Sequence, residues 1–483
     1  MKTITAGPTE VDARDAETTP SVRGALASLA LSVWLSSLGT SIANVALPNL
    51  AEAFNASFPA VQWIVIVYLL AITTLIVSAG RLGDIMGRRR LLLIGIALFT
   101  LASLLCGMAP TLGLLIAARA LQGLGAAIMM ALTMAFVGET VPQEQTGSAI
   151  GLLGTMSAIG TALGPSLGGL LIAGFGWRAI FFINLPLGAL TLFLAHRYLA
   201  DRPRKPKAER TGFDMIGTLL LALSLAAYAL AMTTGRASFG LLNGLLLLVA
   251  FLGVGLFVFV EVRTTSPLIQ LAMFRQLALR ASLATCALVS TVMMATLVVG
   301  PFYLSRALGL DAAMSGLVLS VGPAVAALTA LPAGRIADSR GAPWVMAVGL
   351  LGMAAGTVTL SVVPATFGIP GYIAPIIVLT ASYAFFQTAN NTAVMRDVSP
   401  DQRGAISGLL NLSRNLGLIT GASLMGAVFA FGTATTDLTT ASPYHIAAGM
   451  RLTFAVAAAL IGAALVITAE AYRRTCRSTE RAP

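Results

Sequence analysis

Long apolar runs, separated by short charged or Pro/Gly-rich breaks, fill almost the whole chain. A helix needs about 20 apolar residues to cross the hydrocarbon core of a bilayer, and runs of that length recur here. Cutting the chain at the breaks predicts fourteen membrane-spanning helices, over residues 24–48, 60–80, 90–108, 112–138, 147–173, 178–198, 213–234, 241–261, 281–305, 314–335, 343–363, 371–395, 404–430 and 446–471. We therefore expect an all-α polytopic membrane protein embedded in the lipid bilayer.

The composition supports this class and removes others. Of the 483 residues, 57% are hydrophobic and 10% are charged, whereas a soluble protein carries roughly 25% charged residues. A net charge of +11 would suggest nucleic-acid binding in a soluble chain. In a membrane chain it reflects the excess of Lys and Arg in cytoplasmic loops, so no nucleic-acid partner is expected. Cys106, Cys286 and Cys476 are too far apart to suggest a disulfide framework or a metal cluster, and neither a metal nor a cofactor is expected.

The distribution of Lys and Arg predicts the orientation. With both termini in the cytoplasm, 24 of these residues fall in the tails and cytoplasmic loops, four fall outside and two lie within spans. Cytoplasmic loops carry the excess of positive charge, so the bias predicts a multi-pass protein of the inner membrane with both termini cytoplasmic. Residues 1–23 are polar, unlike a cleavable signal peptide, and are predicted to form a disordered cytoplasmic tail.

A repeat indicates the architecture. "EQTGSAIGLLGTMSAIGTALGPSLGG" at 144–169 aligns with "DQRGAISGLLNLSRNLGLITGASLMG" at 401–426. Two six-helix halves related as parallel repeats are typical of secondary transporters, whose substrate sites lie near mid-membrane between the halves. The predicted domains are an N-terminal six-helix bundle at 24–198, a basic linker at 199–212, two additional helices at 213–261, a linker at 262–280, a C-terminal six-helix bundle at 281–471 and a tail at 472–483.

The stretch "GRLGDIMGRRR" at 80–90 separates the second and third spans, and a paler copy, "GRIADSRGAPW", follows at 334–344. Glycines let the backbone turn tightly and approach a neighbour, so that Asp84 can face the positive N-terminal end of another helix. By repeat symmetry that helix begins near residue 404, and Asp338 would meet the helix that begins near residue 147. We expect this contact to be a latch between the cytoplasmic faces of the halves; the alternative is a plain positive-inside anchor. The predicted latch residues are Gly80, Asp84, Gly87, Arg88, Glu139 and Asp338.

The fifth span carries a periodic set of small residues. Gly160, Gly164 and Gly168 recur every four residues, so they share one helix face and permit close packing. Pro165 removes a backbone donor and bends the helix. Gly169 follows directly after Gly168. A bend beside a smooth seam suits an element that rocks while it stays sealed. Ordinary small-residue packing is the alternative.

Two arginines fall inside predicted spans, where a charge is expensive and must face polar protein or a water-filled cavity. Arg119 has Gln122 one turn away on the same helix face. Arg414 has Asn411 and Asn415 nearby in the thirteenth span. A structural arginine satisfied by backbone carbonyls is the alternative for Arg119.

Polar and aromatic residues of four spans are predicted to line a cavity between the halves. Trp63 and Tyr68 would form an apolar wall, although an interfacial aromatic often only anchors in lipid headgroups. The predicted lining residues are Asn44, Gln62, Trp63, Tyr68, Gln387, Asn390, Asn391, Asn411, Arg414 and Asn415.

These motifs together resemble the major facilitator superfamily, in particular its fourteen-helix drug:proton antiporter branch. The turn at 80–90 is similar to the family signature G-x-L-x-D-R-x-G-R-[KR], with Ile85 where an Arg is usual. "RALQGLG" at 119–125 resembles the motif of the fourth helix, "GTALGPSLGG" at 160–169 resembles the antiporter motif of the fifth, and "VQWIVIVYLL" and "SGLLNLSRNLG" agree with the branch. The resemblance implies the major facilitator fold, and it covers nearly the whole chain.

The resemblance also implies roles for named residues. It assigns Arg119, with Gln122, to proton coupling, and the glycine face of the fifth helix to suppressing leak in export. The branch usually carries an acid in the first helix, just before a Thr, where this chain has Gly39. No Asp or Glu lies in the middle of any predicted span. The proton carrier would therefore have to be a residue near a cytoplasmic end, with Glu139 the best placed, or a protonatable substrate.

The sequence thus predicts a transporter that exports amphipathic small molecules, driven by protons. A narrower exporter of anionic or neutral metabolites is the alternative, which a pathway charged only by arginines would suit. A membrane-embedded enzyme lacks support because His196 and His445 lie at span ends and no nucleophile–base arrangement is visible. We expect a monomer.

Overall fold

The structure is a computed structural model that describes residues 22–140, 146–199, 214–233, 240–264, 276–395, 403–434 and 441–479. All regular structure in these ranges is helical, which confirms the predicted all-α class. The helices are α1 (Val22–Val45), α2 (Leu47–Ala53), α3 (Phe58–Met86), α4 (Arg88–Met108), α5 (Leu112–Thr140), α6 (Thr146–Phe175), α7 (Ala179–Phe182), α8 (Asn184–Tyr198), α9 (Met215–Thr233), α10 (Leu241–Arg263), α11 (Leu277–Phe302), α12 (Ala312–Arg340), α13 (Ala342–Val362), α14 (Gly368–Met395), α15 (Arg403–Thr420), α16 (Gly426–Gly432) and α17 (Pro443–Thr479), with π-helices η5 (Tyr303–Ala307) and η8 (Gly421–Met425) and the 3-10 turn η6 (Ala365–Phe367).

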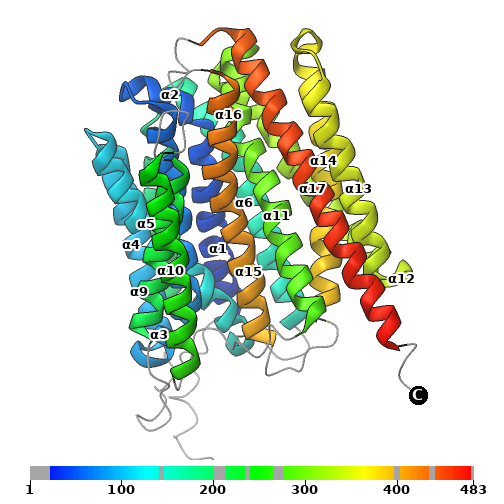
Figure 1. Ribbon diagram of the computed structural model, residues 1–483. Helices are drawn as coiled ribbons and strands as arrows, with labels where there is room; N and C mark the ends of the chain where they lie inside the picture. Colours follow the sequence, from blue (N-terminus) through cyan, green and yellow to red (C-terminus); the bar gives the residue numbers. More distant parts are fainter. Residues whose placement is uncertain are drawn as a thin grey trace, which may run out of the picture.

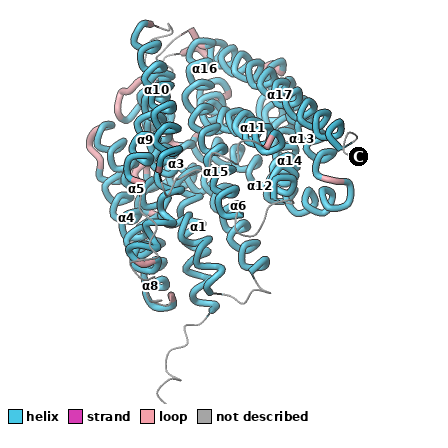
Figure 2. Tube along the Cα trace, turned by 60° about the horizontal axis from the view of Figure 1, so that its bottom comes forward, coloured by secondary structure: helices cyan, strands magenta, loops and turns pink. Residues whose placement is uncertain are grey.

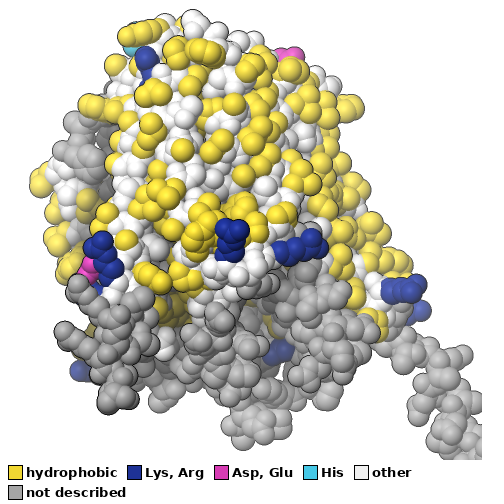
Figure 3. All heavy atoms as spheres, turned by 90° about the vertical axis from the view of Figure 1, so that its right-hand side faces the viewer, with side chains coloured by type: hydrophobic (Ala, Val, Ile, Leu, Met, Phe, Trp, Pro, Cys, Tyr) yellow, Lys and Arg dark blue, Asp and Glu magenta, His cyan; other side chains and the backbone are white. Residues whose placement is uncertain are grey.

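Thirteen helical segments of the described ranges are long and apolar enough to cross a membrane. The remaining predicted span, 213–234, coincides with α9, whose apolar stretch Met215–Ala231 is shorter than the others. Hydrophobic side chains are spread over the face shown in Figure 3, and α10 exposes large apolar side chains such as Phe251 and Leu252. A water-soluble protein would bury these side chains, so the surface fits a bilayer.

The long helices stand side by side (Figure 1). Helices α1–α8, here called the N-terminal group, lie on one side, and α11–α17, the C-terminal group, lie on the other. The α9–α10 hairpin flanks the bundle beside α3 and α15 (Figure 2). Its contacts reach both groups, because Thr218 Oγ1 bonds Ser78 Oγ of α3 at 2.7 Å and Tyr228 Oη bonds Thr420 Oγ1 of α15 at 3.2 Å.

The helices run alternately up and down, so α1 begins at the same end at which α3, α8, α10 and α12 finish. Arginines gather there, at the lower end in Figure 3, and include Arg88, Arg90, Arg263 and Arg340. We call this the basic end and the opposite one the distal end. The grouping of charge matches the loop bias in the sequence.

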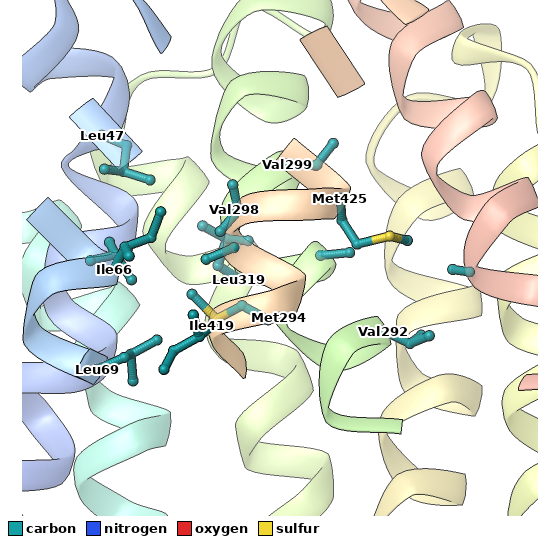
Figure 4. Packing of buried hydrophobic residues seen from close by; sticks show 14 of the residues in the cluster. Leu47, Ile66, Leu69, Val292, Met294, Val298, Val299, Leu319, Ile419 and Met425 are labelled. Carbon is teal, nitrogen blue, oxygen red and sulfur yellow. The ribbon is translucent and has the colours of Figure 1, made fainter. Parts of the chain in front are cut away.

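The core crosses from one group to the other. The larger cluster of buried apolar residues draws on both groups, and Figure 4 shows Leu69 of α3, Met294 of α11 and Ile419 of α15 among its members. A second cluster, which includes Leu29, Phe99 and Leu132, lies within the N-terminal group alone. Burial therefore joins the two groups into one body.

The same local packing occurs in both groups. Ser41 Oγ of α1 donates to Gly160 O of α6 at 3.3 Å, and Thr291 Oγ1 of α11 donates to Gly417 O of α15 at 3.0 Å. Gly160 and Gly417 are the matched glycines of the repeat. The sequence repeat is thus also a repeat of helix contacts.

The predicted charged loop at 80–90 is mostly helical. α3 continues to Met86 and α4 begins at Arg88, so only Gly87 breaks the helix, with φ 94°. Its repeat equivalent Gly341 has φ 89° between α12 and α13. The helix thus continues beyond the apolar run into polar residues. It ends at Gly87, whose positive φ favours glycine.

Gly80 and Gly83 differ in how closely they pack against described neighbours. Gly80 lies inside α3, and a Cβ added there would meet no described atom within 4 Å. Gly83 is instead the glycine of this stretch that packs closely, since its Cβ would lie 2.6 Å from Leu132 Cδ2 of α5. The expected approach of Gly80 to the helix that begins near residue 404 stays a prediction, because the side chains at that helix start lie outside the described parts.

Candidate functional site

Arg119 is held by a ring of neutral groups inside the N-terminal group. Its side chain is fully buried. Nε donates to Ile64 O at 3.1 Å, and Nη1 donates to Gly39 O at 3.2 Å. Nη1 also donates to Gln122 Oε1 at 2.6 Å, and Gln122 Nε2 donates to Ser103 Oγ at 2.7 Å. The helical spacing of Arg119 and Gln122 therefore does bring the two side chains together.

An aromatic ring completes this site. The guanidinium carbon of Arg119 lies 4.0 Å from the centroid of the Tyr68 ring, a geometry that stabilises a cation on the ring face. The Tyr68 hydroxyl donates to Ser36 O at 2.9 Å. Arg119 Nη2 is buried without a hydrogen-bond partner. The charge is thus stabilised by dipoles and one ring, and the two N–H groups of Nη2 have no acceptor among the described residues.

Three glycines of α6 form the contact with α1. A Cβ on Gly160 would lie 2.7 Å from Trp34 O, and one on Gly168 would lie 2.7 Å from Val45 Cγ1. At Gly164 it would collide with Ser41 Oγ and lie 3.0 Å from Ile42 N. This face therefore binds α6 to its own group, through the close approach that the small residues allow.

Gly169 lies on a different face of α6, against α12 of the C-terminal group. Its Cβ would collide with Ala312 O and lie 3.1 Å from Gly316 Cα. A Cβ on Gly316 would in turn collide with Pro165 O and lie 3.0 Å from Gly169 Cα. Gly169 and Pro165 thus form a seam between the groups near the distal end.

A second seam is related to the first by the repeat. Gln62 Nε2 of α3 donates to Ala422 O of the π-helix η8 at 2.8 Å. Gln62 and Gly316 are repeat equivalents at an offset of 254 residues, and Pro165 and Ala422 are equivalents at an offset of 257. In both seams a carbonyl of an irregular helix meets the partner group. π-helical turns often mark functional sites, and here Gln62 donates to a carbonyl of the π-helix.

Aromatic rings and an ion pair close the distal end further. Phe58 of α3 packs edge-on against Phe302 at 4.8 Å and Phe429 at 5.5 Å between ring centroids. Arg306 forms an ion pair with Glu52 of α2. A cavity of about 200 Å³ remains beside this pair, and it is lined from both groups by Val45, Pro48, Asn49, Glu52, Pro301, Ser305, Arg306, Leu310, Asp311, Ala312 and Ser315.

Arg414 differs from Arg119 in its surroundings. It is half-buried on α15, and its side chain forms no hydrogen bond or ion pair with any group in the described ranges. Tyr383 of α14 and Cys286 of α11 lie within electrostatic reach of its charge. Asn411, three residues earlier, shares its face and is also half-buried.

The structure separates the other predicted lining residues. Asn44, Gln62, Tyr68, Asn390 and Asn415 are buried, Trp63 and Gln387 are half-buried, and Asn391 is exposed. Asn390 accepts from Ser282 Oγ at 2.6 Å inside the C-terminal group, and Tyr68 lies beneath Arg119. Trp63 packs on the edge of the large core cluster. In this conformation, Trp63, Gln387, Asn411 and Arg414 are half-buried and Asn391 is exposed, so these five are the predicted lining residues that keep accessible surface.

The predicted latch lies largely outside the described parts. The side chains of Asp84, Glu139 and Asp338 are not among those that the structure describes. Arg88 is half-buried at the first turn of α4 and has an interaction partner.

Sequence reasoning missed two buried carboxylates. Asp214 is 8% exposed and Glu261 is 3% exposed, at the basic ends of α9 and α10. Asp214 Oδ1 accepts from Gly217 N at 2.8 Å, which caps α9. Their position at span ends was visible in the sequence, but nothing there indicated their burial. Among the described residues, no group of three or more His, Cys, Asp or Glu could hold a metal ion.

Comparisons with known proteins agree with this geometry. The Major Facilitator Superfamily profile matches residues 29–422 and 283–477. Multidrug resistance protein Stp of Mycobacterium tuberculosis is 32% identical over 416 residues, 84% of this chain and 75% of that protein. Riboflavin transporter RibZ of Clostridioides difficile is 30% identical over 452 residues, 93% of this chain and 97% of that protein.

A solved structure shares the fold. The inward-facing, unoccupied structure of a bacterial homolog of the human lysosomal transporter Spinster superposes with a TM-score of 0.70 at 16% identity, covering 94% of this chain and 98% of that one. The likeness at this identity concerns the fold alone, whereas the profile match and the relatives above 30% identity concern the family. The chain therefore belongs to the Major Facilitator Superfamily, a family of membrane transporters rather than enzymes.

Proposed function

We propose that this protein exports amphipathic small molecules across the inner membrane in exchange for protons, by alternating access between its two helix groups. Membership of the family supports transport, and the relative named as a multidrug resistance protein supports efflux. The relative named as a riboflavin transporter extends the range to single metabolites. The chain would act as a monomer with both termini in the cytoplasm.

One observation carries the proposal: the two groups meet at the distal end through two seams that the repeat relates to each other. The Gly169–Gly316 contact and the Gln62–Ala422 hydrogen bond occupy equivalent positions. An alternating-access transporter needs such paired contacts, because rocking one group against the other must break both together. If the basic end faces the cytoplasm, as positive charge favours, this conformation is closed to the outside.

Proton coupling is proposed for Arg119, Gln122 and Glu139. The polar site of Arg119 contacts the backbone of α1 and α3, at Gly39 and Ile64. A change in the charge or position of Arg119 would therefore reach two helices of the N-terminal group at once. Glu139, at the basic end of the same helix α5, would exchange protons with the cytoplasm.

The latch is proposed for the same end. Asp84 and Asp338 would hold the basic faces together when the distal end is open, so that one end is always closed. The positive φ of Gly87 and Gly341 supports a pair of equivalent turns at these places.

The test is transport by purified protein in liposomes with an acidic lumen and the basic end facing the bath. The fluorescent neutral amphiphile phenylnaphthylamine is the probe. Gradient-driven uptake that a protonophore stops, and that empty liposomes lack, supports the proposal. Arg119→Gln should bind the probe but lose the response to the gradient. Uptake with the same rate in the absence of a gradient would rule out proton antiport.

A further inference from the structure

The two arginines within the spans are stabilised in opposite ways. Arg119 is fully buried and uses backbone carbonyls, Gln122 and the Tyr68 ring. Arg414 is half-buried and has none of these partners in the described ranges. A guanidinium presents five donors and stays charged at any physiological pH. No described residue uses the donors of Arg414, so they can serve a molecule that enters the pathway.

Arg414 lies too deep in the membrane for its donors to face bulk water at an end of the bundle. Arg414 lies eleven residues after the first residue of α15, roughly 16 Å along the helix axis at 1.5 Å per residue. That is about half the thickness of a hydrocarbon core. A charge at this depth cannot face lipid cheaply, so its accessible side faces an internal, water-filled space.

The packing of α15 shows which of its faces is taken by a neighbouring helix. Ser413 Oγ donates to Leu283 O of α11 at 2.5 Å, and a Cβ on Gly417 would lie 2.7 Å from Ser290 Cβ of the same helix. These positions bind α15 to α11. Arg414 lies beside this face rather than on it. Asn411 lies one helical turn away, on the same face as Arg414.

The described polar groups that lie near Arg414, or one helical turn from a residue near it, are neutral. Tyr383 lies within electrostatic reach, and Gln387 follows one turn later on α14, with a buried Oε1 that has no partner. Asn411 adds an amide. The buried carboxylates of the described ranges, Asp214 and Glu261, lie at the basic ends of α9 and α10 rather than here.

We propose that Arg414 binds an acidic group of the exported molecule, so that the substrates are amphiphiles that carry a carboxylate or sulfonate rather than a permanent positive charge. Guanidinium–carboxylate bonds are among the strongest in proteins, because both partners are charged and two bonds form side by side. The surrounding amides and hydroxyl complete the shell of the acid. This inference rests on the proposed export function and names its substrate class.

Equilibrium binding to the purified protein tests the inference directly. The probes are anilinonaphthalene sulfonate and its uncharged parent phenylnaphthylamine, which share one aromatic body. Wild-type protein should bind the sulfonate more tightly. Arg414→Gln should weaken sulfonate binding about tenfold or more and leave the neutral probe within about twofold. Arg414→Lys should restore part of the difference, and Arg90→Gln, which removes an exposed charge at the basic end, should change neither.

Transport of the same two probes separates the possible failures. A loss of sulfonate transport alone in Arg414→Gln supports the inference. If Arg414→Gln binds and transports both probes as the wild type does, the inference is overturned while export stands. If charge-selective binding depends on Arg414 but neither probe is moved by a proton gradient, the export proposal fails and the anion site remains. Tighter binding of a quaternary ammonium dye than of the sulfonate by the wild type would also overturn the inference.

Discussion

The Nη1 atom of Arg119 donates a hydrogen bond to the backbone carbonyl of Gly39, at 3.2 Å. Gly39 stands where the related fourteen-helix transporters usually carry an acid, so the missing side chain would lie beside this guanidinium. A Cβ on Gly39 would be 2.9 Å from the Tyr68 hydroxyl and 3.2 Å from Phe99 Cζ. In this chain a backbone carbonyl and a ring occupy the space next to the arginine.

This contact predicts an asymmetry between two isosteric variants. Gly39→Asp and Gly39→Asn should both crowd Tyr68 and Phe99, since either adds a Cβ. The Asp carboxylate should neutralise Arg119, because a hydrogen bond between charged groups contributes more than a neutral one, so the Asp variant should be the more stable by about 1–3 kcal/mol. The melting temperatures of the two purified variants in detergent measure the difference. Equal melting temperatures would show that residue 39 and Arg119 do not interact through side chains.

The α1–α6 contact predicts that identical substitutions in one helix have opposite effects. Gly164→Ala should destabilise the protein and impair transport, because the new methyl group collides with Ser41 Oγ and the backbone of Ile42. Gly154→Ala is the matched control: its Cβ meets nothing within 4 Å, and Ala is favoured over Gly in a helix by roughly 0.5–1 kcal/mol. Melting temperature and transport rate are compared for both. A neutral Gly164→Ala would mean that α6 is not closely bound to α1.

The turn between α3 and α4 predicts a second matched pair. Gly87 has φ 94° and ψ 122°, a conformation that costs a side-chain-bearing residue about 1–3 kcal/mol. Gly87→Ala should therefore lower the melting temperature. Gly80→Ala, only two helical turns away, should leave it unchanged or raise it, because Gly80 lies in regular helix and no described atom lies within 4 Å of its added Cβ. If Gly80→Ala is the more harmful, the turn conformation is not what limits stability here.

The latch proposal predicts a loss of function without a loss of fold. Asp84→Asn keeps the size of the side chain but removes the charge that a helix N-terminus attracts. It should insert into membranes at wild-type levels and lose most of its transport. Arg90→Gln, at an exposed position nearby, controls for a change of charge at this end. Wild-type transport by a well-folded Asp84→Asn protein would contradict the latch.

The sequence predicted those features that a single physical constraint determines. Bilayer thickness sets the length of an apolar run, so the spans were visible, and the 3.6-residue period placed Gln122 beside Arg119. The apolar run predicts an end at residue 80, whereas α3 continues to Met86. A helix that leaves the membrane can continue with polar residues, and here Gly87 ends it. Apolar length gave no signal for that end.

The contacts of the site were less predictable, because most use backbone atoms. Gly39 O, Ile64 O and Ala422 O accept the bonds of Arg119 and Gln62, and a carbonyl has no signature in a sequence. Gln62 was expected in the cavity because it is polar and within a span. Its partner is a carbonyl of the π-helix η8, an element that the sequence pattern did not indicate.

The seam at Gly316 leads to the sharpest test of alternating access. A methyl group on Gly316 would collide with Pro165 O and crowd Gly169 Cα. Because backbone atoms cannot move aside as a flexible side chain can, the two groups must separate at the distal end. Gly316→Ala should therefore favour the conformation that is open there. Gly322→Ala on the same helix is the control, since its Cβ would meet Thr380 Cγ2 at 3.2 Å within the C-terminal group.

Labelling of a distal cysteine reports the shift. Ser315 lines the distal cavity and is only 3% exposed, so Ser315→Cys should react slowly with a membrane-impermeant maleimide. Cys106 and Cys286 are buried, and Cys476 is replaced by Ser to leave a single reactive site. Added Gly316→Ala should raise the labelling rate severalfold, whereas Gly322→Ala should not. If Gly316→Ala leaves the rate unchanged while the protein stays folded, the Gly169–Gly316 seam does not hold the distal end closed, and the main support for alternating access in this chain is lost.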